Sequence, residues 1–420
     1  MNWETQCKQK SFYLSQMEKR IPKDDTLRII DKKVDLSFVN ELAKPYYSSL
    51  GPIGYSPERL FRMLVVMYME NISSERKLVE QLNVNIKYMW FTRTDLDSPI
   101  PDHSTFSVLR NRLTDKVFKE ISVRIVSAIM DLGVAHPKSI SVDSTSVLAD
   151  VKFPCKEDKD SLTEGKQILS ANDPDARYGR TSKTDSFFGY KAQLMVDNDT
   201  SCILNIEATP GNSDDYDLEK AFIEEPIKNN IKPQEAALDK GFDSYKIRSL
   251  FKRQHIKTAI PVRSTKYDHL NLYKIDDFKI DLKDKKVICP ANKELEYAGF
   301  EKRKSNYMFV GSECRKCALR EKCTRYPTRQ LYVNQDYLLK QEAIAFNSTE
   351  EYRAIFKKRS CVERVIGEAK RFHGMLRAKF RRLWKLKIQC YLTAIVINLK
   401  RTAKFFVGQQ EGLLTARAGP

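Results

Sequence analysis

The order of strand-like and helix-like segments between residues 139 and 262 limits the fold more than any other feature of this sequence. "SISVDSTSV" at 139–147 reads as a strand, and two alternating apolar runs around the turn-rich "DNDTS" at 197–201 predict a hairpin. A helix is expected at 215–227, a strand ending at Asp239, a helix at 244–254 and a strand at 256–262. This succession predicts a mixed α/β layer with Asp143 on its first strand.

The segments around this layer predict further regions. Residues 1–135 are expected to form a helical domain, because Ser56, Pro57 and Glu58 make a good helix start and few polar residues interrupt 60–69. The domain that contains the mixed α/β layer is expected at 136–264 and 348–408. An insertion at 265–347 is expected between its two parts, and a disordered tail at 409–420. A capping box is expected at Ser348, with Glu351 three residues later.

The segment "PDHSTFSVLRNRL" at 101–113 predicts a basic amphipathic helix. Phe106, Leu109 and Leu113 fall on one face, with Arg110 and Arg112 elsewhere. Such a helix could enter a DNA groove, or it could simply pack one face and expose the other. Both interpretations stay open from this segment alone.

The charge of the chain indicates a polyanionic partner. There are 73 Lys and Arg against 55 Asp and Glu, which gives a net charge of +18. Neutralising phosphates releases condensed counterions, so nucleic acid is the first expectation and an anionic membrane surface the second. No apolar stretch reaches the roughly 18 residues that would span a bilayer. The polar start of the chain predicts an intracellular protein with reduced cysteines.

Four cysteines fall in the predicted insertion: Cys289, Cys314, Cys317 and Cys323. "CRKCALREKC" has the close spacing that suits tetrahedral thiolate ligation of zinc. A structural Zn2+ would stabilise a weakly apolar segment that otherwise lacks a core. Ordinary reduced thiols are an equally good interpretation.

The candidate catalytic residues are acidic. Asp143 and Asp239 occupy strand positions, although an aspartate at a strand end often only caps a turn. Phe356, Arg359, Glu363 and Lys370 recur at spacings of three, four and seven, which would place them on one face of a single helix.

Glu368 competes with Glu363 for the catalytic role on this helix. The two lie five residues apart and therefore point roughly 140° away from each other. Arg359 lies four residues before Glu363 and Lys370 seven after it, whereas no comparable set surrounds Glu368. We therefore assign catalysis to Glu363 and a solvated or ion-paired role to Glu368.

These motifs together resemble those of bacterial insertion-sequence transposases of the DDE type. The resemblance rests on "VDST" around Asp143, "GYKAQLMVD" at 189–197, "TPGNSDD" at 209–215, "LDKGFDS" around Asp239 and the helix carrying Arg359, Glu363 and Lys370. The narrower match is to the branch with a Y-R-E-K signature, from which Phe356 departs because the signature has Tyr there. An aromatic stacking role survives that change, but a hydrogen bond from a phenol does not.

The resemblance implies an RNase H-like mixed sheet with flanking helices, and a DNA-binding role for the helical domain at 1–135. It also implies that Asp143, Asp239 and Glu363 converge on two Mg2+ or Mn2+ ions, because three carboxylates need cations to offset their repulsion. Arg359 and Lys370 would hold the backbone of the transposon end, and 351–390 contains thirteen Lys and Arg against three Glu. Lys191 and the "RYGRTSK" segment are further DNA-contact candidates, although each cation singly could be solvated.

The expected activity is cleavage of element ends and joining of their 3'-OH to target DNA. Paired ends suggest a homodimer or higher assembly on double-stranded DNA, in the cytoplasm with the nucleoid. A structure-selective nuclease would share the carboxylates but lack strand transfer. A non-catalytic domesticated DNA-binding protein would share the fold. Such a protein has usually lost one of the catalytic carboxylates, whereas all three are present in this sequence.

Overall fold

The computed structural model describes residues 12–48, 50, 53–155, 161–164, 167–181, 185–213, 226, 230–263, 272–303 and 305–417, with the backbone alone for 161–164, 167 and 410–417. The chain divides into two compact units. The first unit consists of Met1–Ala237 and Lys357–Pro420, and the second of Leu238–Phe356. The two units are described separately below.

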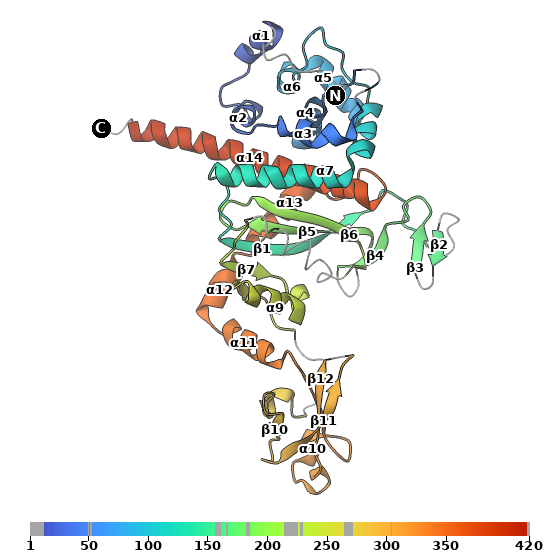
Figure 1. Cartoon of the computed structure of the whole chain (residues 1–420), viewed down its shortest axis with the longest axis vertical. Helices are drawn as coiled ribbons and strands as arrows, with labels where there is room; N and C mark the ends of the chain where they lie inside the picture. Colours follow the sequence, from blue (N-terminus) through green and yellow to red (C-terminus); the bar gives the residue numbers. More distant parts are fainter. Residues whose placement is uncertain are drawn as a thin grey trace. The chain divides into compact units, whose positions relative to one another are not determined.

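Helices fill the N-terminal part of the first unit (Figure 1). They are α1 (Phe12–Arg20), α2 (Thr26–Lys33), α3 (Phe38–Ala43), η1 (Lys44–Tyr46), α4 (Pro57–Met69), α5 (Glu75–Val84), α6 (Ile86–Phe91) and α7 (Ser104–Asp131). The predicted start of α4 is confirmed, because the Ser56 hydroxyl accepts a hydrogen bond from Arg59 N at 3.1 Å and Pro57 occupies the first turn. All residues of α4 are buried.

The helix predicted at 101–113 forms the first part of α7, which breaks at Thr114 (φ 58°). Phe106, Leu109 and Leu113 are buried, as the pattern predicts. Arg110 is buried too: it pairs with Glu75 and lies 4.2 Å from the ring centre of Phe380. The structure therefore confirms that the apolar face packs and removes Arg110 from the residues available to a groove, whereas Arg112 is exposed and lies 4.3 Å from the ring centre of Tyr47.

A sheet forms the centre of the first unit. Its strands there are β1 (Ser139–Leu148), β4 (Arg177–Arg180), β5 (Ser186–Asp197), β6 (Ile203–Pro210) and the start of β7 (Glu235–Leu238), in the order β4-β5-β1-β7 with β6 also on β5. The predicted hairpin is confirmed, because β5 and β6 pair antiparallel from Tyr190↔Pro210 onward. β4 instead pairs with the start of β5, from Ser186 to Gly189.

Gly189 lies where the partner of β5 changes from β4 to β6. A Cβ at this position would collide with the carbonyl oxygen of Val147 on β1, so only glycine lets the two strands approach this closely. The short hairpin β2 (Ser161–Glu164) and β3 (Gln167–Ser170) precedes β4. The helix predicted at 215–227 lies almost entirely outside the described residues.

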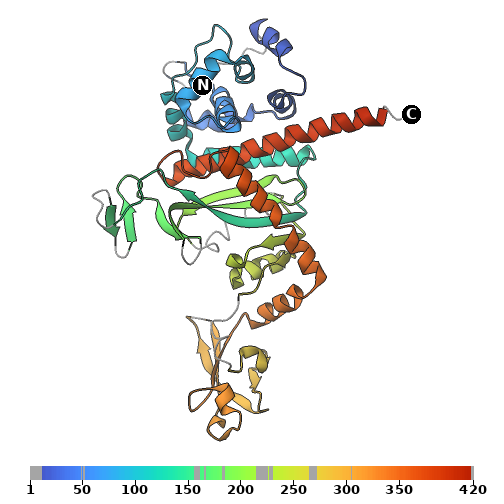
Figure 2. The ribbon, with the colours of Figure 1, turned by 180° about the vertical axis from the view of Figure 1, so that it is seen from behind.

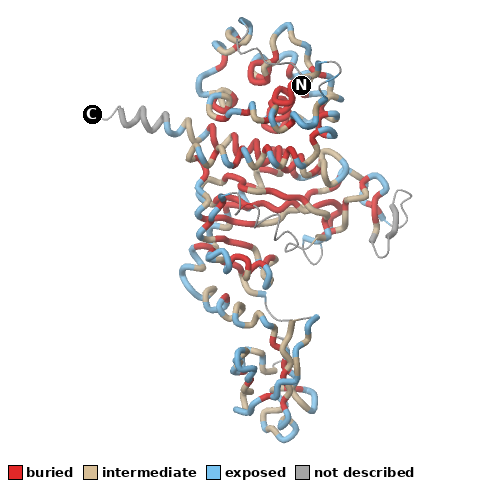
Figure 3. The backbone as a smooth tube through the Cα atoms, viewed as in Figure 1, coloured by how far each residue is buried: buried red, intermediate tan, exposed pale blue. Residues whose placement is uncertain are grey.

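Two long helices cover this sheet beside β6. α14 (Leu383–Arg417) packs against α7 and β6, as Figures 1 and 2 show, and buried residues line the surfaces where these elements meet (Figure 3). Asn398 of α14 is buried and hydrogen-bonds to both Ile203 N (2.7 Å) and Ile203 O (2.8 Å) on β6. The prediction of a disordered tail from residue 409 is wrong for the described backbone, because α14 continues to Arg417.

The single helix predicted around Phe356 and Lys370 is wrong. The structure has α12 (Glu350–Lys357) and α13 (Ser360–Phe372) with Lys358 and Arg359 between them. Thr349 caps α12 by accepting from Tyr352 N at 3.1 Å, whereas the Ser348 hydroxyl donates to Ala345 O. The predicted capping box at Ser348 is therefore wrong, and a single side-chain cap lies one residue later, at Thr349.

The second unit contains a sheet of its own. Its elements are η3 (Lys240–Phe242), α9 (Tyr245–Arg253), β8 (Lys257–Ala259), η4 (Ile275–Asp277), β9 (Lys279–Asp281), β10 (Lys286–Ile288), β11 (Glu294–Glu301), β12 (Asn306–Val310), η5 (Cys314–Lys316), α10 (Arg320–Cys323), β13 (Gln330–Asn334) and α11 (Tyr337–Asn347), followed by α12. α9 and β8 confirm the predicted helix and strand. The order β13-β12-β11-β10-β9 makes a five-stranded antiparallel sheet.

This second sheet buries a small hydrophobic core. The core residues are Phe278, Val287, Leu295, Phe309, Leu331 and Val333. The expectation that the insertion lacks a core is therefore wrong, because Phe278 and five apolar side chains of β10, β11, β12 and β13 pack together. The predicted mixed α/β class is confirmed by the two sheets and their helices.

Candidate functional site

Asp143 lies near the middle of β1, where the strand changes from buried to partly exposed residues. Its neighbours Ser141 and Val142 are fully buried, and across the sheet Asp143 is opposite Leu194 of β5. Its Oδ1 accepts a hydrogen bond from Ser144 N at 2.8 Å. The side chain is 14% exposed, so the central strand holds this carboxylate in a nearly water-excluded position.

Arg359 joins Asp143 to Glu363. Its Nη2 donates to Asp143 Oδ2 at 2.7 Å, and its Nη1 donates to Glu363 Oε1 at 2.7 Å. The Arg359 side chain is 17% exposed and that of Glu363 is 57% exposed. We call these two ion pairs the Arg359 bridge. It places Asp143 and Glu363 around one cation although 220 positions separate them in the chain (363 − 143).

α13 presents Glu363 from its first turn, where the helix dipole favours an acidic side chain. Val362 and Val365 are buried where α13 lies against β1 and β5. Cys361 fixes the start of this helix, since its Sγ lies 3.2 Å from Ser201 Oγ and 3.7 Å from Asp197 O. The packing of α13 on the sheet thus brings Glu363 toward β1.

Glu368 has a different neighbour. It forms an ion pair with Arg401 of α14, and its side chain is 22% exposed. The two glutamates of α13 thus pair with cations on different elements, as their rotation about the helix predicts.

Lys370 and Lys191 also belong to the first unit. Lys370 is half-buried on α13, and burial lowers the pKa of its amine. Lys191 of β5 donates to Ser213 O at 3.0 Å and lies opposite Ser146 of β1. These two lysines are therefore partly shielded cations, not fully solvated ones.

Phe356 lies in the second unit, on α12. Its ring stacks on that of Tyr352, with centroids 5.6 Å apart and an angle of 9° between the rings. Burial raises the pKa of the Tyr352 phenol. The sequence analysis missed this stacked pair, although its spacing of four residues on one helix could have indicated it.

Asp239 follows β7 directly and caps η3. Its Oδ2 accepts from Gly241 N at 3.5 Å. Arg263 holds the same turn, because it donates to Lys240 O at 3.0 Å and to Gly241 O at 2.5 Å. Asp239 therefore begins a turn that side-chain contacts fix within the second unit.

The carboxylates suit a hard divalent cation, because Mg2+ and Mn2+ prefer oxygen ligands. Asp143 and Glu363 already share one positive partner, which fits an acidic pair that needs a cation. Within the described ranges, however, no group of three or more His, Cys, Asp or Glu side chains is arranged so that it could hold a metal ion.

The four cysteines of the second unit line one cavity of about 30 Å³. Cys289 Sγ accepts from Lys293 N at 3.4 Å, and Cys314 Sγ accepts from Arg329 N at 3.4 Å. Sequence spacing and the fold therefore bring Cys289 and Cys323 to the same place as the C-x-x-C pair. Among the described residues, these four thiols too are not arranged so that they could hold a metal ion.

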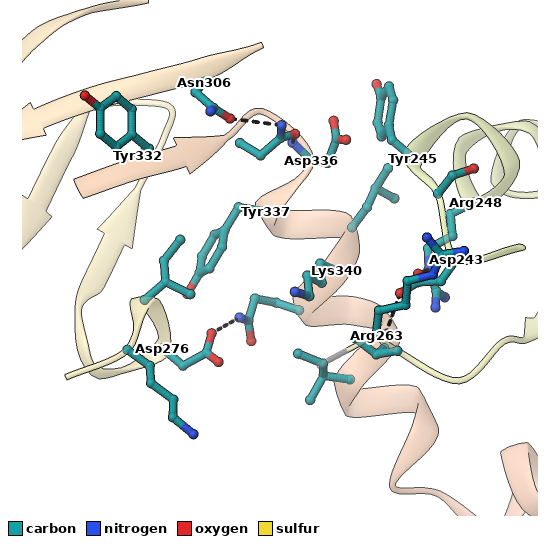
Figure 4. A pocket seen from close by; sticks show the side chains of 18 residues that line it. Asp243, Tyr245, Arg248, Arg263, Asp276, Asn306, Tyr332, Asp336, Tyr337 and Lys340 are labelled. Carbon is teal, nitrogen blue, oxygen red and sulfur yellow. Dashed lines mark hydrogen bonds and ion pairs between the residues drawn. The ribbon is translucent and has the colours of Figure 1, made fainter. Parts of the chain in front are cut away.

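A larger cavity of about 620 Å³ also lies in the second unit. Figure 4 shows Arg263 beside Asp243, with Tyr337 and Lys340 on another wall. Burial raises the pKa of Asp336 in this wall to about 6. None of the residues predicted for catalysis or DNA binding lines this cavity, so it is separate from the predicted site.

No helix in the part of the chain that the structure covers is both long enough and apolar enough to cross a membrane.

Comparison with known proteins places these observations in a family. Residues 136–399, more than half of the chain, match the family described as "Transposase DDE domain", and residues 15–112 match "Transposase domain (DUF772)". No curated protein matches the sequence.

Solved structures show weaker likenesses. One is a piggyBac transposase synaptic complex with hairpin DNA, at 14% identity and a TM-score of 0.37, covering 94% of this chain and 78% of that one. Another is a pre-cleavage Mos1 transpososome, at 11% identity and a TM-score of 0.18, covering 83% of this chain and 98% of that one. These TM-scores are too low to support a conclusion.

Proposed function

The chain belongs to the family of transposases with a DDE domain, and on this premise we propose that it cleaves the ends of an insertion sequence and joins their 3'-OH groups to target DNA. Family membership makes it a DNA transposase, an enzyme of a family that generally uses divalent metal ions and whose fold is RNase H-like. The observation that carries the proposal is the Arg359 bridge, because it gathers Asp143 from β1 and Glu363 from α13 around one guanidinium.

We propose Asp143, Asp239 and Glu363 as the ligands of two Mg2+ or Mn2+ ions. Bound there, such ions would activate an attacking hydroxyl and stabilise the leaving 3'-oxygen. β1 supplies a rigid position for Asp143, and the turn after β7 supplies one for Asp239. Rigid backbone suits this role because metal ligands must be held to fractions of an ångström.

Arg359 and Lys370 are the proposed contacts to the backbone of the transposon end. Arg359 presents a planar guanidinium that can bind a phosphate through two parallel hydrogen bonds. Lys370 is a partly buried amine, so a phosphate beside it would restore the interactions that burial removes. Lys191 is a further proposed contact. The Phe356–Tyr352 stack offers an aromatic surface for a base, and Tyr352 carries a phenol where Phe356 has none.

Pairing two similar ends favours a homodimer or higher assembly with twofold symmetry on DNA. The proposed place of action is the cytoplasm, where the nucleoid supplies both ends and target. The terminal inverted repeats of the element would be recognised in part by the helices of residues 12–131, whose match to a transposase domain supports a DNA-binding role.

Purified protein incubated with a labelled end duplex, target plasmid and Mg2+ tests this proposal. We expect cleaved ends and joined products, both lost in Asp143→Asn, which should still bind the duplex because Lys and Arg contacts to phosphates supply most affinity. Cleavage without joining would indicate a nuclease. Binding without cleavage would indicate a non-catalytic DNA-binding protein.

Zinc binding by Cys289, Cys314, Cys317 and Cys323 also remains a proposal. The second sheet has a hydrophobic core, so zinc is not needed to replace one. Two observations support zinc binding: the four thiols line one cavity, and backbone N–H groups donate to two of the sulfurs. The thiols would have to close around the ion. Metal analysis of protein purified without chelators should find about one zinc per chain, as a closed four-thiolate site implies. Zinc-free, fully folded protein would make them ordinary thiols.

A further inference from the structure

Two partners of Arg359, Asp143 and Glu363, are proposed metal ligands. The guanidinium reaches Asp143 Oδ2 with one nitrogen and Glu363 Oε1 with another, each at 2.7 Å. The Arg359 and Asp143 side chains are only 17% and 14% exposed, so this pair is weakly screened by salt. Both ion pairs of the Arg359 bridge are thus short, and the one with Asp143 is shielded from solvent.

The guanidinium and a divalent cation need the same carboxylates. Two carboxylates held close together repel each other unless a cation lies between them. In this structure that cation is Arg359, and Mg2+ or Mn2+ would have to bind oxygens that Arg359 already engages. A positive guanidinium left in place would also repel the incoming ion.

We propose that Arg359 is an internal counterion that competes with the divalent cation for Asp143 and Glu363. Binding of DNA would then favour metal loading, because a backbone phosphate offers Arg359 another partner of matching bidentate geometry. This inference rests on the proposed function, since it assumes that Asp143 and Glu363 bind the metal.

The position of Arg359 in the chain permits such a change of partner. Arg359 lies at the junction between α12 and α13, with helical backbone angles at the N-terminus of α13 (φ −56°, ψ −27°). Its long side chain can rotate to a new partner while the backbone stays helical. Glu363 is 57% exposed, so one end of the Arg359 bridge already faces solvent, from which DNA would approach.

Mn2+ binding to DNA-free protein, followed by electron paramagnetic resonance, tests the competition without any activity measurement. Arg359→Gln should bind Mn2+ at least about tenfold more tightly than wild type, which corresponds to about 1.4 kcal/mol. Arg364→Gln is the matched control, because Arg364 is an exposed arginine on the same helix, and its Mn2+ affinity should equal that of wild type. Unchanged or weaker Mn2+ binding by Arg359→Gln would overturn the inference.

Two additional variants separate this inference from the proposed function. If Asp143→Asn and Glu363→Gln bind Mn2+ as wild type does, the proposed metal ligands are wrong. If both lose Mn2+ while Arg359→Gln gains no affinity, only the counterion role fails. Arg359→Lys should bind Mn2+ with intermediate affinity, because an ammonium keeps the positive charge but cannot bond to both carboxylates with the planar geometry of a guanidinium. If Arg359→Gln does not fold in EDTA, Arg359→Lys replaces it in the comparison with wild type.

The coupling to DNA has its own measurement. A saturating concentration of end duplex should raise the Mn2+ affinity of wild type by a larger factor than that of Arg359→Gln. In the proposal, DNA promotes metal binding by drawing Arg359 away from the carboxylates, and this contribution is lost when the guanidinium is removed. An equal gain in both proteins would refute the coupling.

Discussion

Replacement of Arg62 should destabilise the first unit more than replacement of any exposed arginine. Arg62 is buried on α4, with 4% of its side chain exposed. Its Nε donates to Glu58 Oε1 at 2.8 Å, and its Nη1 donates to Asp31 Oδ1 at 2.8 Å. The two carboxylates are themselves only 7% and 12% exposed, so Arg62→Met would leave two buried acidic groups without their shared cation.

The expected cost follows from the partners that remain. Removing one member of a buried ion pair costs about 3–5 kcal/mol, because the other charge stays buried and uncompensated. Asp31 keeps Arg93 at 2.6 Å, and Glu58 keeps a hydrogen bond from Asn40 at 3.2 Å. We therefore expect the lower end, about 3 kcal/mol, which is a fall in Tm of about 6–12 °C at roughly 2–4 °C per kcal/mol.

Thermal unfolding followed by near-ultraviolet circular dichroism measures this effect. Arg76→Met is the control, because Arg76 is exposed on α5 and its replacement should change stability little. The double variant Arg62→Met with Glu58→Gln should recover at least about 1 kcal/mol of the loss, since the uncompensated charge is gone. A Tm for Arg62→Met within about 2 °C of that of Arg76→Met would refute the reasoning. So would a double variant whose loss of stability equals the sum of the losses of its two single variants.

Three further predictions concern the proposed site. Glu363→Gln should abolish Mg2+-dependent cleavage in a gel assay while Glu368→Gln, which loses only a pair with Arg401, keeps most activity; the reverse result would contradict the assignment. Phe356→Tyr should keep cleavage activity within about threefold and Phe356→Ala should reduce it at least about tenfold, because a ring at this position keeps the aromatic surface shared with Tyr352, on which a base would stack at about 1–3 kcal/mol. Equal activities of the two variants would exclude base stacking on Phe356. Burial lowers the pKa of Lys370, so its amine loses its proton at a lower pH than a free lysine does. End binding, measured by fluorescence anisotropy, should therefore weaken as the pH rises toward the ordinary lysine pKa of about 10.4 in wild type but not in Lys370→Arg, and parallel pH profiles would remove Lys370 from the DNA contacts.

Local sequence patterns predicted the individual elements of this chain well. The strand carrying Asp143, the β5–β6 hairpin, α9 and β8 all form where periodicity and turn residues place them. These features depend on side-chain period and turn chemistry within about ten residues, which is information that a single sequence contains. The motifs around Asp143 and Glu363 also indicated the family, which the match over residues 136–399 confirms.

Only the tertiary structure decided which charges meet. Arg110 of α7 looks like a candidate for a DNA groove in the sequence but is buried against Glu75, and the helix around Phe356 divides in two. Arg359 pairs with Asp143, which lies 216 positions earlier, and Glu368 pairs with Arg401 on another helix. No local pattern specifies these pairs, because their members lie far apart in the sequence. A long cationic side chain pairs with a carboxylate that the packing of α13 and α14 places within its reach.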